Sequence, residues 1–130
     1  MNNLYGQNNK ENQNRRAVGT CYETAAMRFL ETQGYRILCR NYRTRRGEID
    51  LIALCEDGRT LAFIEVKYRK TARCGMPSEA VDVRKQIRIR NTAEQYLLEN
   101  ALFDAAVRFD VVEILDNKIR VIKHAFTAYL

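Results

Sequence analysis

The sequence lacks the residues from which zinc sites are usually built. It has one histidine, and its four cysteines are separated by gaps of 16 to 19 residues with no Cys-x-x-Cys pair. A zinc site of ordinary ligand spacing is therefore not expected. Cys39 and Cys55 lie in apolar segments, where a free cysteine packs as a small core residue. We therefore predict reduced structural thiols.

Long hydrophobic runs are also absent. No segment approaches the roughly 20 apolar residues of a membrane helix, and the Asn-rich N-terminus lacks the apolar stretch of a secretory signal. We expect a cytoplasmic protein that does not bind a membrane. The 130 residues, 46% of them hydrophobic and 29% charged, fit one globular domain. Residues 1–16 are polar and aperiodic, so we predict a disordered polar tail followed by a single domain over residues 17–130.

Positive charge is concentrated in one segment. Residues 36–90 carry 14 Lys and Arg against 7 Asp and Glu, whereas the rest of the chain carries 8 and 9. Such a local excess is expected of a face that meets a polyanion such as nucleic acid. A solvated basic surface explains the same excess equally well, so charge alone does not decide between the two.

Hydrophobic periodicity predicts two helices and five strands. The helices are expected over residues 17–33, ending at Gly34, and from about Glu79 to Glu99, with Ser78 as the N-cap. The strands are expected over residues 36–42, 48–55, 60–67, 107–115 and 118–123. The order α-β-β-β-α-β-β predicts an α/β fold with a mixed five-stranded sheet flanked by helices.

The second and third strands form the most informative segment. Asp57-Gly58 is a favoured centre for a two-residue type I′ turn, and this turn would place Leu51 opposite Ile64. One face of the hairpin, which includes Ile49 and Leu51, is then wholly apolar. On the other face Asp50 lies opposite Glu65, and Glu48 opposite Lys67.

Two acids in this position predict a cation site. Like charges directly opposed across a sheet destabilise it, so Asp50 and Glu65 require a cation or a raised pKa. Mg²⁺ prefers such oxygen ligands, and Lys67 is on the same face of the strand. Carboxylates, metal and ammonium are the groups that phosphodiester hydrolysis requires. The alternative is an ordinary salt-bridged edge in which Lys67 neutralises Glu65 and Glu48.

At these residues the sequence resembles a known family. It is similar to the YraN family of bacterial proteins, in the restriction-endonuclease-like PD-(D/E)XK superfamily, and its pattern is similar to that of archaeal Holliday-junction resolvases. The resemblance covers about residues 17–126. It rests on the motifs Gly19-x-x-x-Glu23-x-x-Ala26, Gly34-Tyr35-x-Ile37-Leu38-x-Arg40-Asn41-Tyr42-Arg43, Gly47-Glu48-Ile49-Asp50-Leu51-Ile52-Ala53, Phe63-Ile64-Glu65-Val66-Lys67, Val81-x-x-x-Lys85-x-x-Arg88, Arg108-Phe109-Asp110-Val111-Val112 and Ala125-Phe126.

The resemblance implies a restriction-endonuclease-like fold with three metal-binding carboxylates. Asp50, Glu65 and Lys67 would be the catalytic residues, and Glu23 would join Asp50 and Glu65 in binding Mg²⁺ or Mn²⁺. Tyr22 stands where the family usually has a second glycine, which bears on how closely the first helix approaches a substrate. Resolvases act as dimers, so a homodimer is implied by analogy.

Other polar residues are assigned around this site. Glu48 would support it by pairing with Lys67, and Asp110, inside an apolar strand, is predicted to make a structural hydrogen bond. Lys85 could contact a phosphate, although a solvated helix lysine is the simpler interpretation. The candidates for contacts with the nucleic-acid backbone are Arg40, Arg43, Arg45, Arg46, Arg69, Arg73, Lys85 and Arg88.

These observations predict a Mg²⁺-dependent endonuclease that hydrolyses phosphodiester bonds in nucleic acid, with branched DNA as the leading substrate. One alternative is a non-catalytic nucleic-acid-binding protein that retains the metal site. Another is an interaction module whose basic surface recruits an acidic protein partner.

Overall fold

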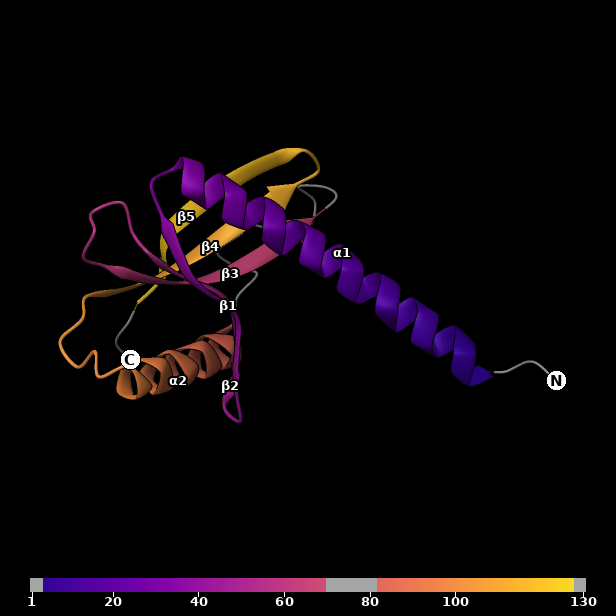
Figure 1. The fold of residues 1–130 in the computed structure, drawn as a ribbon, viewed down its shortest axis with the longest axis horizontal. Coiled ribbons are helices and arrows are strands. Elements are labelled where there is room, and N and C mark those ends of the chain that lie inside the picture. The colour runs from indigo at the N-terminus through magenta and orange to yellow at the C-terminus, as the bar shows by residue number, and fades with distance from the viewer. Residues whose placement is uncertain (1–3, 70–81, 128–130) are drawn as a thin grey trace.

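A computed structural model describes residues 4–69 and 82–127, with side chains from residue 16 onward. It contains a five-stranded sheet with one helix on each face (Figure 1). The predicted α/β class and element order are confirmed. In chain order the elements are α1 (Leu4–Thr32), β1 (Arg36–Thr44), β2 (Gly47–Leu54), β3 (Leu61–Arg69), α2 (Val83–Glu99), β4 (Val107–Leu115) and β5 (Lys118–Phe126).

The strands lie in the sheet in the order β1-β2-β3-β4-β5. β3 and β4 are parallel, and all other neighbours are antiparallel. A parallel pair needs a long crossover connection, and here the crossover contains α2. The sheet is therefore mixed, as predicted, and α2 is placed against the strands that carry Asp50 and Glu65.

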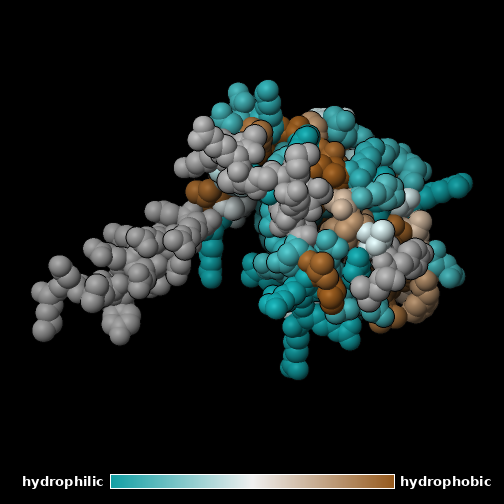
Figure 2. All heavy atoms as spheres, turned by 180° about the vertical axis from the view of Figure 1, so that it is seen from behind, coloured by the Kyte–Doolittle hydropathy of each residue, from teal (hydrophilic) through white to brown (hydrophobic). Residues whose placement is uncertain are grey.

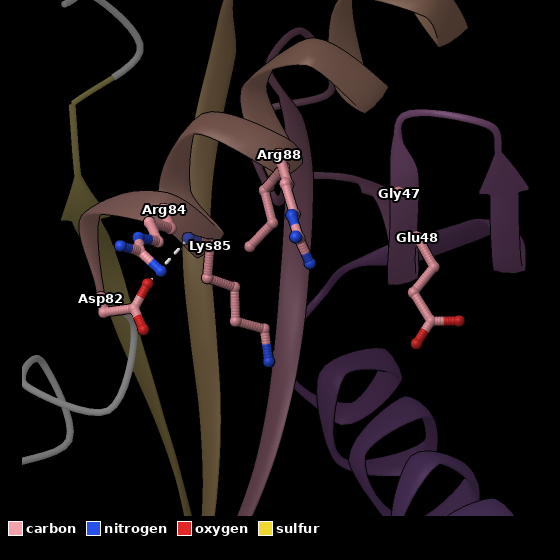
Figure 3. Close-up of a pocket in the computed structure, with 7 residues that line it drawn as sticks. Gly47, Glu48, Asp82, Arg84, Lys85 and Arg88 are labelled. Atoms are coloured by element: carbon pink, nitrogen blue, oxygen red, sulfur yellow. Dashed lines mark hydrogen bonds between the residues drawn. The ribbon is translucent and has the colours of Figure 1, made fainter.

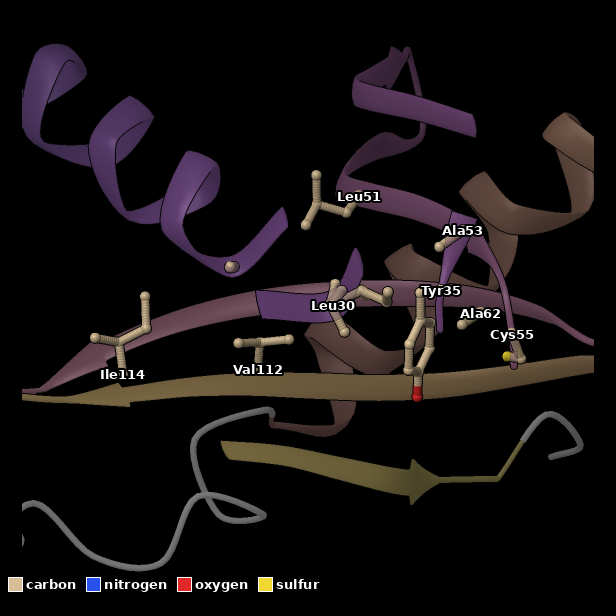
Figure 4. Packing of buried hydrophobic residues seen from close by; sticks show 10 residues of the cluster. Leu30, Tyr35, Leu51, Ala53, Cys55, Ala62, Val112 and Ile114 are labelled. Atoms are coloured by element: carbon tan, nitrogen blue, oxygen red, sulfur yellow. The ribbon is translucent and has the colours of Figure 1, made fainter. Parts of the chain in front are cut away.

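Two hydrophobic clusters hold the helices to the sheet. Ala26 and Leu30 of α1 pack on Leu51 and Ile64 (Figure 4), while Ile89 of α2 packs in a second cluster on the opposite face. Side chains from both faces of β2 and β3 are fully buried, because each face is covered by a helix. Asp50, Glu65 and Lys67 of these strands therefore lie at the edge of an apolar core.

The β2–β3 register is confirmed near the turn, where Leu51 pairs with Ile64 and Leu54 with Leu61. The predicted turn type is wrong. The Gly58 N–H donates to the Cys55 carbonyl at 3.0 Å, and the Cys55 N–H donates to the Thr60 carbonyl at 2.8 Å. The reversal thus has Glu56 and Asp57 at its centre, with Gly58 following at φ +70°. The longer turn leaves the register unchanged because Cys55 still faces Thr60.

Both helices begin at different residues from those predicted. α1 begins at Leu4 and not near residue 17 as predicted; the polar composition of residues 4–16 gave no helical signal. It ends as predicted before Gly34, which has φ +91°, and the Tyr35 N–H donates back to the Leu30 carbonyl at 3.0 Å.

α2 begins at Val83, about four residues later than predicted, because extended Asp82 is its N-cap and accepts the Lys85 N–H at 2.8 Å. The proposed cap Ser78 and first-turn Glu79 lie outside the described residues. Since the cap fixes the Lys85 backbone, it also sets where the Lys85 side chain leaves the helix.

Three of the four cysteines fall within the described part of the chain, and all three are free thiols. Cys55 is buried and Cys39 is half-buried, as predicted, whereas Cys21 is exposed. No helix in the described ranges is long and apolar enough to cross a membrane. Hydrophilic side chains cover most of the face seen in Figure 2.

Candidate metal and phosphate site

Asp50 is held where the β2–β3 ladder stops. The paired residues of β2 and β3 end at Leu51 and Ile64, and beyond them the Asp50 Oδ2 accepts the Val66 N–H at 2.8 Å. The Asp50 carboxylate therefore accepts a hydrogen bond from a strand N–H that would otherwise pair with a backbone carbonyl. Ile49 correspondingly packs with the α2-side cluster and not, as alternation predicted, with Leu51.

The carboxyl groups of Asp50 and Glu65 lie close enough to interact. Glu65 is 7% exposed. The pKa of Asp50 is raised to about 7, first by burial and then by the charge of the Glu65 carboxyl beside it, while the Val66 N–H opposes the shift. This environment lacks the compensation that two ionised carboxylates require.

Two lysines partly supply that compensation. The Lys67 Nζ lies 3.4 Å from the Glu65 Oε1, and the Lys85 Nζ makes an ion pair with the same oxygen. Burial lowers the pKa of Lys67, and the neighbouring Lys85 ammonium lowers it as well. Burial acts most strongly on Lys85 and lowers its pKa, but the hydrogen bond to Glu65, the contact with Lys67 and the charges of Glu65 and Asp50 together outweigh burial and leave that pKa raised. Glu65 is the acid to which both cations are attached.

Glu23 acts on this pair from α1, but it does not complete a three-acid cluster. Its charge contributes to the raised pKa of Asp50. Among the residues that the structure describes, no three Asp, Glu, His or Cys side chains are close enough to hold a metal ion together. The adjacent Tyr22 stacks on Tyr68 of β3 with ring centroids 3.9 Å apart. The bulky residue thus fills space between α1 and the sheet.

A cavity of about 450 Å³ lies beside the carboxyl pair, between α2 and the start of β2. Figure 3 shows Arg84, Lys85 and Arg88 extending from the first turns of α2, across from Glu48. Its lining residues are Gly47, Glu48, Asp82, Arg84, Lys85, Arg88 and Ile89. Three cationic side chains against two acidic ones give the lining an excess of positive charge.

Two sequence assignments are wrong. Glu48 pairs with exposed Arg43, at 3.2 Å, and not with Lys67, because the β2–β3 ladder does not extend to these residues. Lys85 is not a solvated helix lysine, since its side chain is 39% exposed and is bound to Glu65.

The arginines predicted to contact nucleic acid do not share one surface. Arg40 donates to Thr24 of α1 at 3.0 Å, whereas the Arg46 guanidinium lies 4.0 Å from Glu94 of α2. The side chain of Arg69 is only 11% exposed and faces buried Glu113. Arg43 and Arg45 are exposed near the β1–β2 turn, and Arg88 lines the cavity. Arg73 lies outside the described residues.

Asp110 has the structural role that the sequence predicted. Its fully buried carboxylate accepts hydrogen bonds from the Arg108 guanidinium at 2.9 and 3.1 Å, the Tyr35 hydroxyl at 3.2 Å and the His124 N–H at 3.1 Å. His124 has a positive φ and lies where the β4–β5 register shifts. The acid therefore satisfies backbone and side-chain donors at an irregularity in the sheet.

Fold and site together define a small α/β domain that carries a buried carboxyl pair beside a basic cavity. The chain belongs to the uncharacterised protein family UPF0102, whose model matches residues 22–114. The membership that the YraN-like motifs predicted is thus confirmed.

Close relatives are bacterial and carry the same family name. A UPF0102 protein of Lachnoclostridium phytofermentans is 51% identical, over 89% of this chain and 98% of its own. One from Alkaliphilus oremlandii is 46% identical, over 86% and 97%. The crystal structure of SSO0001 is 17% identical with a TM-score of 0.42, and the match covers 82% of this chain and half of that one.

Arg84 was not predicted as a site residue, nor was the ion pair of Lys85 with Glu65 predicted. A signal for the first was present, because Arg84, Lys85 and Arg88 at positions i, i+1 and i+4 extend from the same first turns of a helix. No comparable signal existed for the second. That contact depends on how α2 docks on β3, and the spacing of apolar residues leaves this unspecified.

Proposed function

We propose that this protein is a metal-dependent nuclease-type protein that acts on phosphodiester bonds of nucleic acid. The observation that carries the proposal is the Asp50–Glu65 carboxyl pair, held at the edge of the core with the pKa of Asp50 raised to about 7. Such a pair is unfavourable unless a cation joins it. Structural acids have no need of this arrangement, but a metal site does.

The donor set fits Mg²⁺ or Mn²⁺. Mg²⁺ is usually held by one or two carboxylates together with water and substrate phosphate, so Asp50 and Glu65 suffice as the protein ligands. Glu23 adds negative charge from α1, although in the described residues it does not join the pair as a third ligand. When bound, the metal supplies a water of lowered pKa and polarises the phosphate.

The chain's own residues supply the remaining chemistry. Lys67, 3.4 Å from Glu65, stabilises the negative charge that develops on the phosphate. Arg84 and Arg88 line the adjoining cavity and bind neighbouring phosphates, which gives affinity without sequence information. The resemblance to resolvases supports branched DNA as the substrate and a homodimer as the active form. Both expectations, and a location in the cytoplasm where such DNA occurs, belong to this proposal.

One observation favours a second candidate, a nucleic-acid-binding protein without catalysis. Lys85 is already paired with Glu65, so an internal ammonium partly does what a metal would do. In that case binding should weaken steeply with salt and should be the same with EDTA and with Mg²⁺.

A cleavage screen separates the two candidates. The intact chain is incubated with single-stranded, duplex, flapped and four-way DNA and with RNA, in Mg²⁺, Mn²⁺ or EDTA. Asp50→Asn and Lys67→Met keep size while removing charge, and Asp104→Asn, in an exposed loop, is the matched control.

We expect metal-dependent cutting of at least one substrate by the wild-type protein and by Asp104→Asn. Asp50→Asn and Lys67→Met should each reduce the rate by about 100-fold or more, as loss of a charge-stabilising group does, while binding persists. Binding without cleavage under every metal condition would instead support the second candidate.

A further inference from the structure

Lys85 belongs to two sites at once. Its ammonium is bound to the Glu65 Oε1, the oxygen that also faces Lys67, and its side chain lines the basic cavity with Arg84 and Arg88. Figure 3 shows it extending from α2 beside the sheet. An anion that enters the cavity therefore meets the same ammonium that neutralises the candidate metal ligand.

The two partners in this ion pair differ in freedom. The Glu65 side chain is 9% exposed, whereas that of Lys85 is 39% exposed. The Lys85 backbone is anchored, because its N–H is bound by the Asp82 cap at 2.8 Å. A lysine has four flexible methylenes beyond such an anchor. The ammonium can therefore change partner without movement of α2, while Glu65 stays in place.

Charges in the cavity favour that exchange. Arg84 and Arg88 line the same cavity together with Glu48 and Asp82, so cations outnumber acids on the cavity side of Lys85, and the Glu65 carboxylate lies on its other side. A phosphate in the cavity would offer Lys85 a second anionic partner and would reduce repulsion among the three cations.

We propose that Lys85 is a tethered counterion that occupies Glu65 until a phosphate group of the substrate enters the cavity and draws its ammonium away. Glu65 is then free, with Asp50, to take a divalent cation. Metal and phosphate thus bind cooperatively, with Lys85 as the positioning residue that couples them. This inference rests on the proposed function, because it assigns the order in which that site is filled.

The coupling is reciprocal in equilibrium terms. If phosphate binding strengthens metal binding by some factor, metal binding must strengthen phosphate binding by the same factor. Couplings between sites commonly amount to roughly 5- to 150-fold, and we expect about tenfold here because one ion pair is exchanged. Removal of the Lys85 ammonium should produce the high metal affinity without any phosphate.

The test measures Mn²⁺ binding, which needs no catalytic turnover. Free Mn²⁺ is followed by electron paramagnetic resonance as it titrates the intact chain, alone or with a phosphorothioate thymidine pentamer that resists hydrolysis. The variants are Lys85→Met, which keeps the backbone N–H that caps α2, and Arg84→Met, which removes an equal charge from the same cavity without touching Glu65. Asp50→Asn reports Mn²⁺ bound elsewhere, including on the pentamer.

We expect the pentamer to tighten Mn²⁺ binding by about tenfold in the wild-type protein. Lys85→Met should bind Mn²⁺ about tenfold more tightly than wild type without the pentamer, and the pentamer should add little. Arg84→Met should differ from wild type by less than about twofold in metal affinity when the pentamer is absent, since it breaks no ion pair with a ligand.

Each other result has a definite reading. If wild type and Lys85→Met bind Mn²⁺ equally well, and both bind it far more tightly than Asp50→Asn, the counterion role of Lys85 is refuted. The metal site itself is then still supported. Equal gains in Mn²⁺ affinity in Lys85→Met and Arg84→Met would mean that only the total positive charge matters, and they would also overturn the counterion role of Lys85. Wild-type binding no stronger than that of Asp50→Asn refutes the metal site, and with it the proposed function.

Discussion

Two acids at the core of this domain have opposite surroundings. Asp110 is fully buried, and its carboxylate faces a guanidinium, a hydroxyl and a backbone N–H. Asp50 has one backbone N–H, from Val66, and a second carboxyl group beside it. The charges around Asp110 are matched, and stabilisation of the fold is enough to explain this arrangement. Those around Asp50 are mismatched, and mismatch of this kind is what a site that takes up a cation requires.

The contrast extends to the neighbouring residues. Around Asp110, the Arg108 guanidinium also donates to the Tyr35 hydroxyl at 2.6 Å and lies 3.7 Å from Glu56, so each member has a partner. Around Asp50, the cations are attached to Glu65. We infer that removal of the Asp110 carboxylate should destabilise the fold, whereas removal of the Asp50 carboxylate should stabilise it.

The largest effect is expected for Asp110→Ala. The change leaves the buried Arg108 guanidinium without its main anion, and breaking a buried ion pair from one side costs about 3 to 5 kcal/mol. Urea unfolding followed by circular dichroism measures the loss, with exposed Asp104→Ala as the control. A loss below about 1 kcal/mol would mean that the Asp110 network contributes no more than a surface pair.

Asp50→Asn should have the opposite sign. The folded-state pKa of Asp50, about 7, is raised above its ordinary value of 3.8, so its contribution to stability is present below pH 4 and is lost as the pH rises through 7. An amide does not ionise. At pH 8 without metal the variant should therefore be more stable than wild type, on the order of 2 to 4 kcal/mol, with no difference near pH 4.

Urea midpoints across pH 4 to 8 check this prediction, with Asp104→Asn carried in parallel. A difference in urea midpoint between Asp50→Asn and wild type that does not change with pH would contradict the claim that ionised Asp50 destabilises the fold.

A divalent metal ion should relieve the repulsion between the Asp50 and Glu65 carboxylates in the wild-type protein and so stabilise its fold. At ten times the dissociation constant, a ligand that binds only the folded state stabilises it by about 1.4 kcal/mol. Thermal unfolding in Mg²⁺ and in EDTA at pH 8 should differ accordingly for wild type and should coincide for Asp50→Asn. An equal shift in both proteins would indicate that Mg²⁺ acts elsewhere.

The smallest effect is expected for Tyr35→Phe. It removes one hydroxyl from the Asp110 group while Arg108 keeps its carboxylate, so the loss should be about 1 kcal/mol. Urea unfolding at pH 7 gives the value. A loss as large as that of Asp110→Ala would show that the hydroxyl, and not the ion pair, holds the group together.

Local pattern was enough to predict most of the hairpin that carries the site. Alternation in β2 and β3 specified the pairing near the turn, since a slip of one residue would have put Asp50 among the apolar ones, but it put Ile49 on the wrong face. The register survived an incorrect turn type for this reason. The role of Asp110 was also predictable, because an acid inside a largely apolar strand must find partners.

Contacts between elements distant in sequence were not predictable in this way. The ion pair of Lys85 with Glu65 depends on the docking of α2, which composition and spacing do not contain. The Glu48–Arg43 pair is different, because the two residues are opposed in the β1–β2 hairpin, where such pairs form locally. The helical start at Leu4 had no apolar periodicity that could predict it.

The central claim is that Asp50 belongs to an unmatched pair that a divalent cation completes. Carbon-13 NMR of the aspartate carboxyls, assigned with Asp50→Asn, can follow its ionisation directly. We predict that Asp50 titrates near pH 7 without metal and that saturating Mg²⁺ moves its midpoint well below that value. An Asp50 that titrates near pH 4 in both conditions would contradict the account.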